Sequence, residues 1–303
     1  MLVNLNDVLV PAKKGKYGVG MFNAVNLEMA NAIFQAAEEL RAPVIIGTAE
    51  ILLGAASLEN LADMVLNRAR RSPVPVVLHY DHGLSFDKCM EAVRLGFSSI
   101  MYDCSTASYE ENIRQLKEMV KICHAMNISV EGELGHVGDN AGAGKLEKPD
   151  DYYTDPDRAE EFVKETGVDA LAVAVGNAHG DYAFPPRLDF GRIEAIRDRT
   201  GIPLVLHGGS GLSDSDFRKA IARGICKVNI FTDINKAQAA GMKKAMDAGL
   251  TGAFEMTPYE VEAIRVVVEE KMRLFSSPLI KSGCARIFLT GPRRAPVGWR
   301  GAA

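Results

Sequence analysis

ALAVAVGNAHG, at residues 170–180, decides the fold, because an apolar run there ends abruptly in a glycine, an amide and a histidine. The run has no polar alternation, which is typical of a strand whose two faces are both buried in a parallel sheet. Outward from it, short apolar runs recur at regular spacing, and segments with helical periodicity follow them. The predicted strands cover residues 17–22, 43–47, 74–80, 98–102, 128–131, 170–175, 203–206 and 226–230.

These alternating segments predict an α/β fold, a closed (β/α)8 TIM barrel. An open, doubly wound sheet is the alternative. One barrel would span residues 1–275, with its last helix around residues 259–275 packed outside it or on a partner subunit. Residues 276–303 are expected to form a basic tail containing glycine and proline, with five basic residues and no acidic one. The long polar connection over residues 135–155 is expected to be a functional lid or a disordered segment.

The composition of the 303-residue chain is that of an ordinary globular protein, with 47% hydrophobic and 24% charged residues. A net charge of −4 gives no electrostatic reason to bind nucleic acid or an anionic membrane, so neither is an expected partner. The five cysteines are odd in number and lack close pairs, which indicates reduced thiols and not disulfides or a cysteine-rich zinc site. Because no apolar run reaches signal-peptide or transmembrane length, the sequence predicts a cytoplasmic protein.

Polar residues cluster just after the predicted strands, where barrels of this kind carry their chemistry. They are Asn23 and Asn26, Asp81 and His82, Asp103, Glu133, Asn177 and His179, His207, and Asn229, Thr232 and Asp233. Three neutral imidazoles with an open fourth position form a known type of catalytic zinc site. A single histidine is more often structural, but the shared strand-end placement of His82, His179 and His207 predicts a zinc site. Structural roles suit His79 and His124, whereas the role of His136 stays open.

The stretch LHGGSG at residues 206–211 leads from the seventh strand into a glycine-rich turn and then into a helix that begins near Ser213. Glycines allow backbone N–H groups to approach an oxyanion, and the loops after strands 7 and 8 of barrels commonly bind phosphate. A tight turn alone would also explain two adjacent glycines. Together with VNIFTD (residues 228–233) after the next strand, the stretch predicts a phosphate site.

Seven segments make the chain resemble the zinc-dependent class II fructose-bisphosphate and tagatose-bisphosphate aldolases. They are GMFNAVN (20–26), VVLHYDHG (76–83), IMYDCS (100–105), VEGELG (130–135), AVGNAHGDY (174–182), LHGGSG (206–211) and KVNIFTD (227–233). Each segment alone is weak evidence for the resemblance. Seven segments in family order over most of residues 1–275 are specific evidence for it. The resemblance implies reversible cleavage of a ketose phosphate, such as fructose- or tagatose-1,6-bisphosphate, into dihydroxyacetone phosphate and an aldehyde.

The resemblance also implies roles for individual residues. His82, His179 and His207 correspond to the catalytic zinc ligands, and Asp103 and Glu133 to acidic residues at an alternative metal position or beside the ligands. Asp81 corresponds to the acid/base that handles the hydroxyl proton during cleavage. The residues that would hold the ketose phosphate and polarise the enediolate, some through a sodium or potassium ion, are Asn23, Gly180, Gly208, Gly209, Ser210, Asn229 and Thr232. A homo-oligomer, dimer or tetramer, is expected.

Three positions depart from the family pattern. In the long loop the family carries a glutamate that exchanges the proton at the enediolate carbon, and here Ala141 stands in its place. Asp139 is the nearest carboxylate and the predicted replacement, with Glu147 as a more distant candidate. Ala183 stands where the family often has a lysine, and Phe231 where fructose-type enzymes have an aspartate. A non-catalytic partner subunit, or an isomerase or lyase acting on another phosphorylated sugar, is therefore the alternative to an aldolase.

Overall fold

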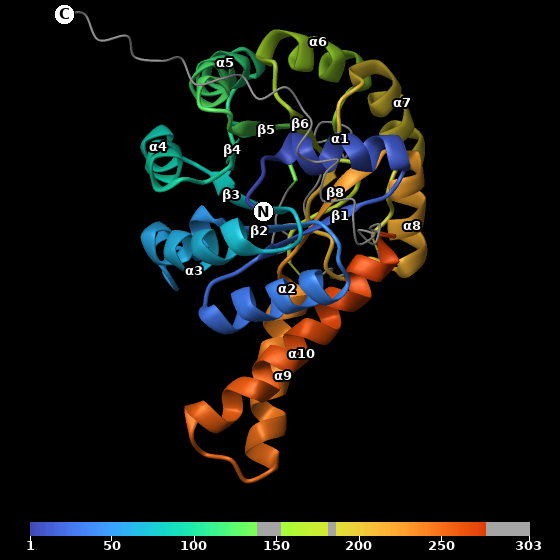
Figure 1. Cartoon of the computed structure of the whole chain (residues 1–303). Helices are drawn as coiled ribbons and strands as arrows, with labels where there is room; N and C mark the ends of the chain where they lie inside the picture. Colours follow the sequence, from blue (N-terminus) through green and yellow to red (C-terminus); the bar gives the residue numbers. More distant parts are fainter. Residues whose placement is uncertain (138–152, 181–185, 277–303) are drawn as a thin grey trace, which may run out of the picture.

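The computed structural model describes residues 1–137, 153–180 and 186–276, and its centre is a closed barrel of parallel strands (Figure 1). Each strand pairs with its neighbour in sequence, and β1 (Val19–Asn23) closes the sheet against β8 (Ile225–Ile230). The other strands are β2 (Val44–Ala49), β3 (Val76–Gly83), β4 (Ser99–Tyr102), β5 (Ser129–Leu134), β6 (Ala170–Val173) and β7 (Leu204–Leu206). The predicted (β/α)8 barrel is confirmed, and the alternative of an open sheet is wrong because the sheet closes on itself.

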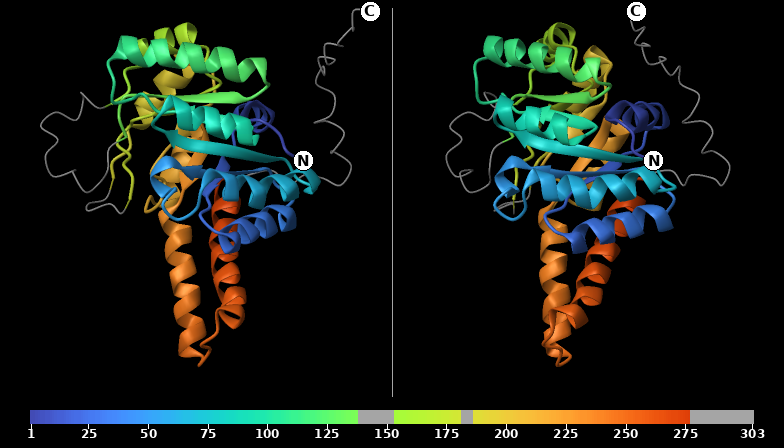
Figure 2. Two further views of the ribbon diagram at one scale, coloured as in Figure 1. Left: turned by 90° about the vertical axis from the view of Figure 1, so that its left-hand side faces the viewer. Right: turned by 60° about the vertical axis from the view of Figure 1, so that its left-hand side comes forward.

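Helices form the layer around the barrel (Figures 1 and 2). They are α2 (Leu27–Glu39), α3 (Leu58–Arg71) after the short 3-10 turn η1 (Glu50–Leu52), α4 (Phe86–Leu95), α5 (Tyr109–Ala125), α6 (Pro156–Thr166), α7 (Phe190–Thr200) and α8 (Asp214–Arg223). Each helix from α2 to α8 follows an Asn, Ser or Asp whose side chain accepts a first-turn N–H, which fixes where the helix begins. No helix among the described residues has both the length and the apolarity needed to span a bilayer.

Side chains that alternate along the strands form two separate apolar cores. Val77 on β3 and Ala172 on β6 belong to the core inside the barrel, whereas their neighbours Leu78 and Val173 belong to the core beneath the helices. Both faces of the strands are therefore buried, which explains the continuous apolar runs of the sequence.

A helix that was not predicted, α1 (Leu5–Gly15), closes the amino-terminal end of the barrel. Its apolar side chains, Leu5, Val8, Leu9 and Ala12, join the inner core. Asn4 and Asp7 form a capping box at its start, while Pro11 inside the helix obscures the helical pattern in the sequence. With this end filled, the chemistry lies at the carboxyl-terminal end of the strands.

An irregularity in β3 decides where its last residues point. Tyr80 pairs with Ile100 and Gly83 pairs with Tyr102, so β3 carries one extra residue against β4. His82 lies in this extra stretch and has a φ of +43°. Because a bulge turns side chains out of strict alternation, consecutive residues can face the same side. The predicted strand ended at residue 80, whereas the observed strand continues to Gly83; β5 likewise runs to Leu134 and not to residue 131.

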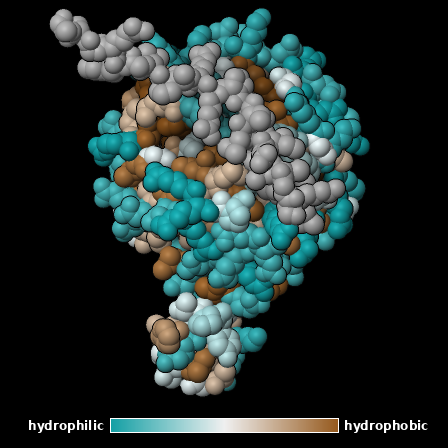
Figure 3. Space-filling view, in the orientation of Figure 1, coloured by the Kyte–Doolittle hydropathy of each residue, from teal (hydrophilic) through white to brown (hydrophobic). Residues whose placement is uncertain are grey.

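The last two helices form a hairpin arm that projects away from the barrel (Figures 1 and 2). It consists of α9 (Thr232–Asp247) and α10 (Ala253–Leu274), which pack on each other, and α10 also packs on α2. The helix predicted around residues 259–275 therefore exists but begins earlier. Hydrophobic surface gathers at the tip of the arm (Figure 3), where Met246 is 62% and Phe254 is 87% exposed.

Candidate active site

Three histidines from three strands meet at the carboxyl-terminal end of the barrel. His82 lies on β3, His179 in the loop after β6 and His207 directly after β7. The centre of the His82 ring lies 4.8 Å from that of His179 and 4.5 Å from that of His207. His82 Nε2 is 2.7 Å from His207 Nδ1, and one ring nitrogen from each residue lies within 4.8 Å of the others. The structure thus brings the three predicted zinc ligands together.

The cluster combines neutral imidazoles with nearby negative charge. Burial, and then the neighbouring His82, lowers the pKa of His179 to about 3, and the same two causes lower the pKa of His207. Burial alone would lower the pKa of His82 as well, but Asp81 and Asp103 outweigh it and raise that pKa to about 9. The carboxylates therefore favour positive charge at the His82 ring, and the other two rings offer nitrogen lone pairs.

Asp103 and Glu133 form an acidic group around the other side of His82. Asp103 Oδ2 is 2.7 Å from His82 Nδ1, and Asp103 Oδ1 accepts the Ser105 N–H at 3.0 Å. Glu133 Oε1 accepts the Val137 N–H at 3.0 Å, while Glu133 Oε2 is buried and accepts no hydrogen bond from the described residues. Burial, reinforced by Asp103, raises the pKa of Glu133 to about 8. His82, Asp103 and Glu133 are thus a second set of side chains close enough to hold an ion.

Asp81 lies beside the cluster and is held by two side-chain amides. Its Oδ2 accepts from Asn23 Nδ2 at 2.9 Å, and its Oδ1 accepts from Asn229 Nδ2 at 3.1 Å. Burial alone would raise the pKa of Asp81, but the neighbouring His82 and the other basic groups hold it well below the ordinary value. Asp81 is therefore an ionised carboxylate, the form that can accept a proton.

A charged layer buried below the histidines was not predicted. Glu131 on β5 and Lys227 on β8 are fully buried, and Lys227 Nζ lies 2.8 Å from Glu131 Oε2. His79 adjoins them, with its Nδ1 2.7 Å from Ser99 Oγ. Burial alone would raise the pKa of Glu131, but Lys227 and the histidines hold it at about 2. The signal was present in VEGELG and KVNI, because a charged residue inside an apolar strand requires a buried partner.

The predicted phosphate segment lies where β7 and β8 end. α9 begins at Thr232, and its N-cap residue, Phe231, supplies no side-chain acceptor; such a helix N-terminus is suited to an anion. Ser210 Oγ adjoins it and accepts the Asp233 N–H at 3.3 Å. Gly209 differs, because its N–H donates to Asn229 O at 3.1 Å. That N–H joins the loop after β7 to β8, so the prediction that Gly209 binds phosphate gains no support from it.

Gly208 allows the loops after β6 and β7 to approach each other. It has a φ of +62°, and a Cβ at this position would lie 1.9 Å from Ala178 O. Since Ala178 directly precedes His179, this contact sets the position of a candidate metal ligand. Gly180, on the other side of His179, has a φ of +80° and no atom within 4 Å of its Cβ position.

We expect Gly208→Ala to displace the His179 loop and reduce metal content. Gly201→Ala is the matched control, because Gly201 has a φ of +66° but no atom within 4 Å of its Cβ position. Both variants should lose roughly 1 kcal/mol of unfolding free energy to the left-handed backbone. Gly208→Ala should lose clearly more, as measured by denaturant unfolding together with metal analysis. Equal losses and equal metal content in both variants would contradict a role for the close contact.

The remaining predicted residues fall into two groups. Among the described residues, Asn26 caps α2, Asn177 Nδ2 donates to His207 O at 3.0 Å, and Phe231 packs against the outer core. His136 Nδ1 lies 3.3 Å from Ser105 Oγ at the edge of the site. Asp139, Ala141, Glu147 and Ala183 lie outside the described residues, as does the predicted basic tail from residue 277 onward.

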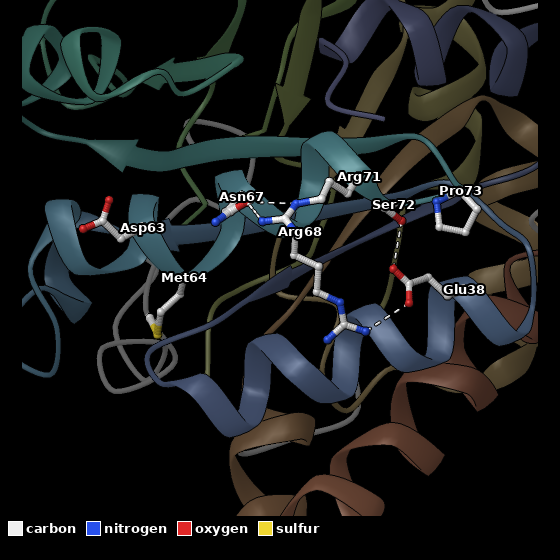
Figure 4. Close-up of a pocket in the computed structure, with 8 residues that line it drawn as sticks. All are labelled: Glu38, Asp63, Met64, Asn67, Arg68, Arg71, Ser72 and Pro73. Atoms are coloured by element: carbon white, nitrogen blue, oxygen red, sulfur yellow. Dashed lines mark hydrogen bonds and ion pairs between the residues drawn. The ribbon is translucent and has the colours of Figure 1, made fainter.

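A polar hollow of about 600 Å³ between α2 and α3 is a separate feature (Figure 4). Two of its arginines bond to neighbours in the lining, Arg68 to Glu38 at 3.0 Å and Arg71 to Asn67. Ser72 in its wall precedes the start of β3, whereas His82 lies near the end of that strand. The hollow is therefore at the opposite end of the barrel from the histidines.

Comparison with known proteins shows the family to which this chain belongs. A sequence profile described as "Fructose-bisphosphate aldolase class-II" matches residues 3–278. "Fructose-bisphosphate aldolase" from Geobacillus stearothermophilus is 41% identical over 288 residues, covering 91% of this chain and 97% of that protein. "Uncharacterized protein YdjI" from Escherichia coli K12 is 42% identical over 267 residues, covering 86% and 92%. The X-ray structure of this YdjI aldolase has a TM-score of 0.83 at 38% identity and covers 91% of this chain and 98% of its own. The chain therefore belongs to the class II fructose-bisphosphate aldolase family and is an enzyme of the lyase class.

Proposed function

We propose that the protein is a zinc-dependent ketose-bisphosphate aldolase. It reversibly cleaves a ketose phosphate, such as fructose- or tagatose-1,6-bisphosphate, into dihydroxyacetone phosphate and an aldehyde. The observation that carries this proposal is the cluster of three histidines beside the ionised Asp81 at the end of the barrel. Family membership supports it, although a fructose-bisphosphate aldolase and YdjI are matched at nearly equal identity, 41% and 42%. The substrate test must therefore compare more than one sugar.

The residues fit a zinc ion. Catalytic zinc takes three protein ligands, and imidazole nitrogen suits it. His82, His179 and His207 would hold the ion, with Asp103 orienting His82 through its other ring nitrogen. The raised pKa of His82 and the unbonded Glu133 Oε2 both indicate that this place favours a cation. When bound, zinc supplies a Lewis acid for negative charge on the substrate oxygens.

Asp81 moves the proton in this proposal. In cleavage its carboxylate takes the C4 hydroxyl proton, the C3–C4 bond breaks, and the aldehyde is released. The electron pair of the broken bond stays on the three-carbon phosphate fragment. This fragment takes up a proton at C3 from the exchange group proposed below, and Asp81 releases its proton to solvent. Asn23 and Asn229 orient the carboxylate for this transfer, and condensation reverses the steps.

The phosphate of the three-carbon fragment would lie beside the N-terminus of α9. In this proposal Gly208, Ser210 and Thr232 would line this place, with Gly180 on the adjoining His179 loop. When bound, a sodium or potassium ion would offset part of the negative charge of the phosphate. Asn23 and Asn229 would contact the substrate from β1 and β8, since each keeps a buried Oδ1 without a hydrogen bond from the described residues.

A metal-supplemented coupled assay with fructose-1,6-bisphosphate and tagatose-1,6-bisphosphate tests the proposal. Formation of dihydroxyacetone phosphate is followed by its enzymatic reduction. We expect cleavage of at least one sugar, its loss after treatment with a chelator, and its return with zinc. Cleavage of neither sugar by zinc-loaded protein would overturn the proposal and favour a non-catalytic partner subunit.

We propose Asp139 as the group that exchanges the C3 proton, since Ala141 replaces the family's glutamate. Asp139→Asn should slow deuterium exchange into dihydroxyacetone phosphate much more than it lowers metal content, and Glu147→Gln should matter less. If no carboxylate of the loop exchanges the C3 proton, Ala141→Glu should raise the exchange rate. Unchanged exchange in Asp139→Asn would remove this residue from the mechanism.

We also propose a homo-oligomer, dimer or tetramer, with apolar contacts on the α9–α10 arm. The exposure of Met246 and Phe254 at its tip supports this assignment. Sedimentation should give a mass above the 32.8 kDa of one chain, and a 32.8 kDa species at micromolar concentration would contradict it.

The cytoplasmic location and the division into a 1–275 domain and a 276–303 tail stay predictions from the sequence.

A further inference from the structure

The ion pair of Glu131 and Lys227 lies directly below the candidate metal ligands and contacts one of them. Lys227 Nζ lies 3.1 Å from Glu131 Oε1 and 2.8 Å from Glu131 Oε2. Both side chains are fully buried. A buried ion pair often stabilises a protein no better than apolar side chains would, because both charges lose their hydration. The pair is therefore a candidate for a role beyond packing.

The sheet is built to place Lys227 inside the barrel. Leu204 pairs with Ile225 and Val205 with Lys227, so β8 carries one extra residue, Cys226, at this point. Cys226 belongs to the inner core, and the buried Lys227 that follows it also reaches Glu131 inside the barrel. The bulge thus gives the barrel interior two consecutive residues of β8.

The two ring nitrogens of His207 face different kinds of groups. Nε2 lies 2.9 Å from Glu131 Oε1, a carboxylate oxygen that can only accept. Nδ1 lies 3.4 Å from Asn229 Nδ2, an amide nitrogen whose other partner is Asp81 Oδ1 at 3.1 Å. An acceptor at Nε2 and a donor at Nδ1 select the tautomer with hydrogen on Nε2 and a lone pair on Nδ1. This Nδ1 is also the atom that faces His82 Nε2, at 2.7 Å.

We propose that Glu131, held in place by Lys227, is a positioning residue that fixes His207 with its Nδ1 lone pair toward the metal. The metal is that of the proposed function, on which this inference rests. Lys227 contacts both carboxylate oxygens, so Glu131 has one orientation and presents one oxygen to His207. The pair thereby selects the tautomer and the ring orientation before any metal binds.

The test removes both charges together, so that neither is left alone in the core. Glu131→Leu/Lys227→Met replaces the pair with apolar side chains of similar size and removes the acceptor from His207 Nε2. Glu131→Gln/Lys227→Met also removes both charges but keeps a carbonyl acceptor for that nitrogen. Ser129→Ala is the control, because Ser129 is buried on the same strand and its Oγ makes no hydrogen bond to the described residues.

Two measurements on metal-free protein distinguish positioning from packing. Histidine ¹⁵N spectra report the tautomer of His207, whose signals are assigned by their loss in His207→Gln. Competition with a chelator reports the affinity for zinc alone. We expect a single Nε2–H tautomer in the wild type and a mixture in the Leu/Met variant. Zinc affinity should fall about ten- to hundredfold in the Leu/Met variant and stay unchanged in Ser129→Ala. It should recover in part in the Gln/Met variant, which keeps the acceptor but lacks the lysine that orients it.

An Nδ1–H tautomer in the wild type would overturn the inference without any variant. So would wild-type zinc affinity in a folded Leu/Met variant, or equal losses in the Leu/Met and Gln/Met variants. The tautomer is measured in the absence of metal and substrate. Its result therefore does not depend on whether the protein is an aldolase. Zinc-loaded protein that cleaves neither sugar overturns the proposed function only.

Discussion

Asp81→Ala is expected to slow carbon–carbon cleavage at least about a hundredfold, the lower range for removal of a positioned acid/base. The reason is that Asp81 is the ionised carboxylate that both Asn23 and Asn229 hold beside the histidines. Metal content should change little, since Asp81 belongs to neither set of candidate ligands. The loss should therefore persist in protein that elemental analysis shows to be fully loaded with zinc.

Stability must be separated from chemistry in this variant. Removing the carboxylate takes the acceptor from Asn23 Nδ2, which costs about 1–3 kcal/mol for a buried group, whereas Asn229 Nδ2 still faces His207 Nδ1 at 3.4 Å. Assays are therefore run well below the unfolding temperature of each variant. Asp87→Ala, in the exposed first turn of α4, removes a nearby carboxylate outside the site and should cleave at the wild-type rate. Unaltered turnover in Asp81→Ala would exclude Asp81 from proton transfer.

Periodicity and strand-end polarity are enough to predict the barrel and much of the candidate site. The apolar runs are local, and in a parallel barrel every strand end points to the same mouth. His82, His179 and His207 could therefore be placed together from three separate segments, and the structure does bring them together. The sequence also indicates where the helices begin, because Ser, Asn or Asp capping residues precede the helical patterns.

The features missed in the sequence depend on register between strands. The extra residue in β3 turns His82 into the site beside Asp81, and the extra residue in β8 brings Lys227 inside the barrel. No residue pattern within one strand marks a bulge, because a bulge is defined by the pairing with the neighbouring strand. Glu131 was visible as a charge in an apolar run, but its partner lies 96 residues away in the chain. α1 was missed for a different reason, because Pro11 inside it obscures the helical pattern.

His207→Ala and His82→Ala are expected to differ in the metal sites that they can still form. Zinc-loaded wild type should contain about one equivalent per chain. His207→Ala disrupts the three-histidine set but leaves His82, Asp103 and Glu133, whereas His82→Ala disrupts both sets because His82 belongs to each. If the three histidines hold the catalytic ion, His207→Ala and His179→Ala should both lose the metal and cleavage, and His82→Ala should do the same.

These variants should remain folded, which makes the comparison decisive. In His207→Ala the Glu131 carboxylate keeps Lys227, and in His82→Ala the Asp103 carboxylate keeps the Ser105 N–H. His124→Ala, which removes an exposed histidine of α5, is the control and should keep full metal content. Retention of one equivalent in His207→Ala together with its loss in His82→Ala would place the ion at His82, Asp103 and Glu133. The three-histidine assignment would then be wrong, and the catalytic role of the metal would have to be derived from the acidic set.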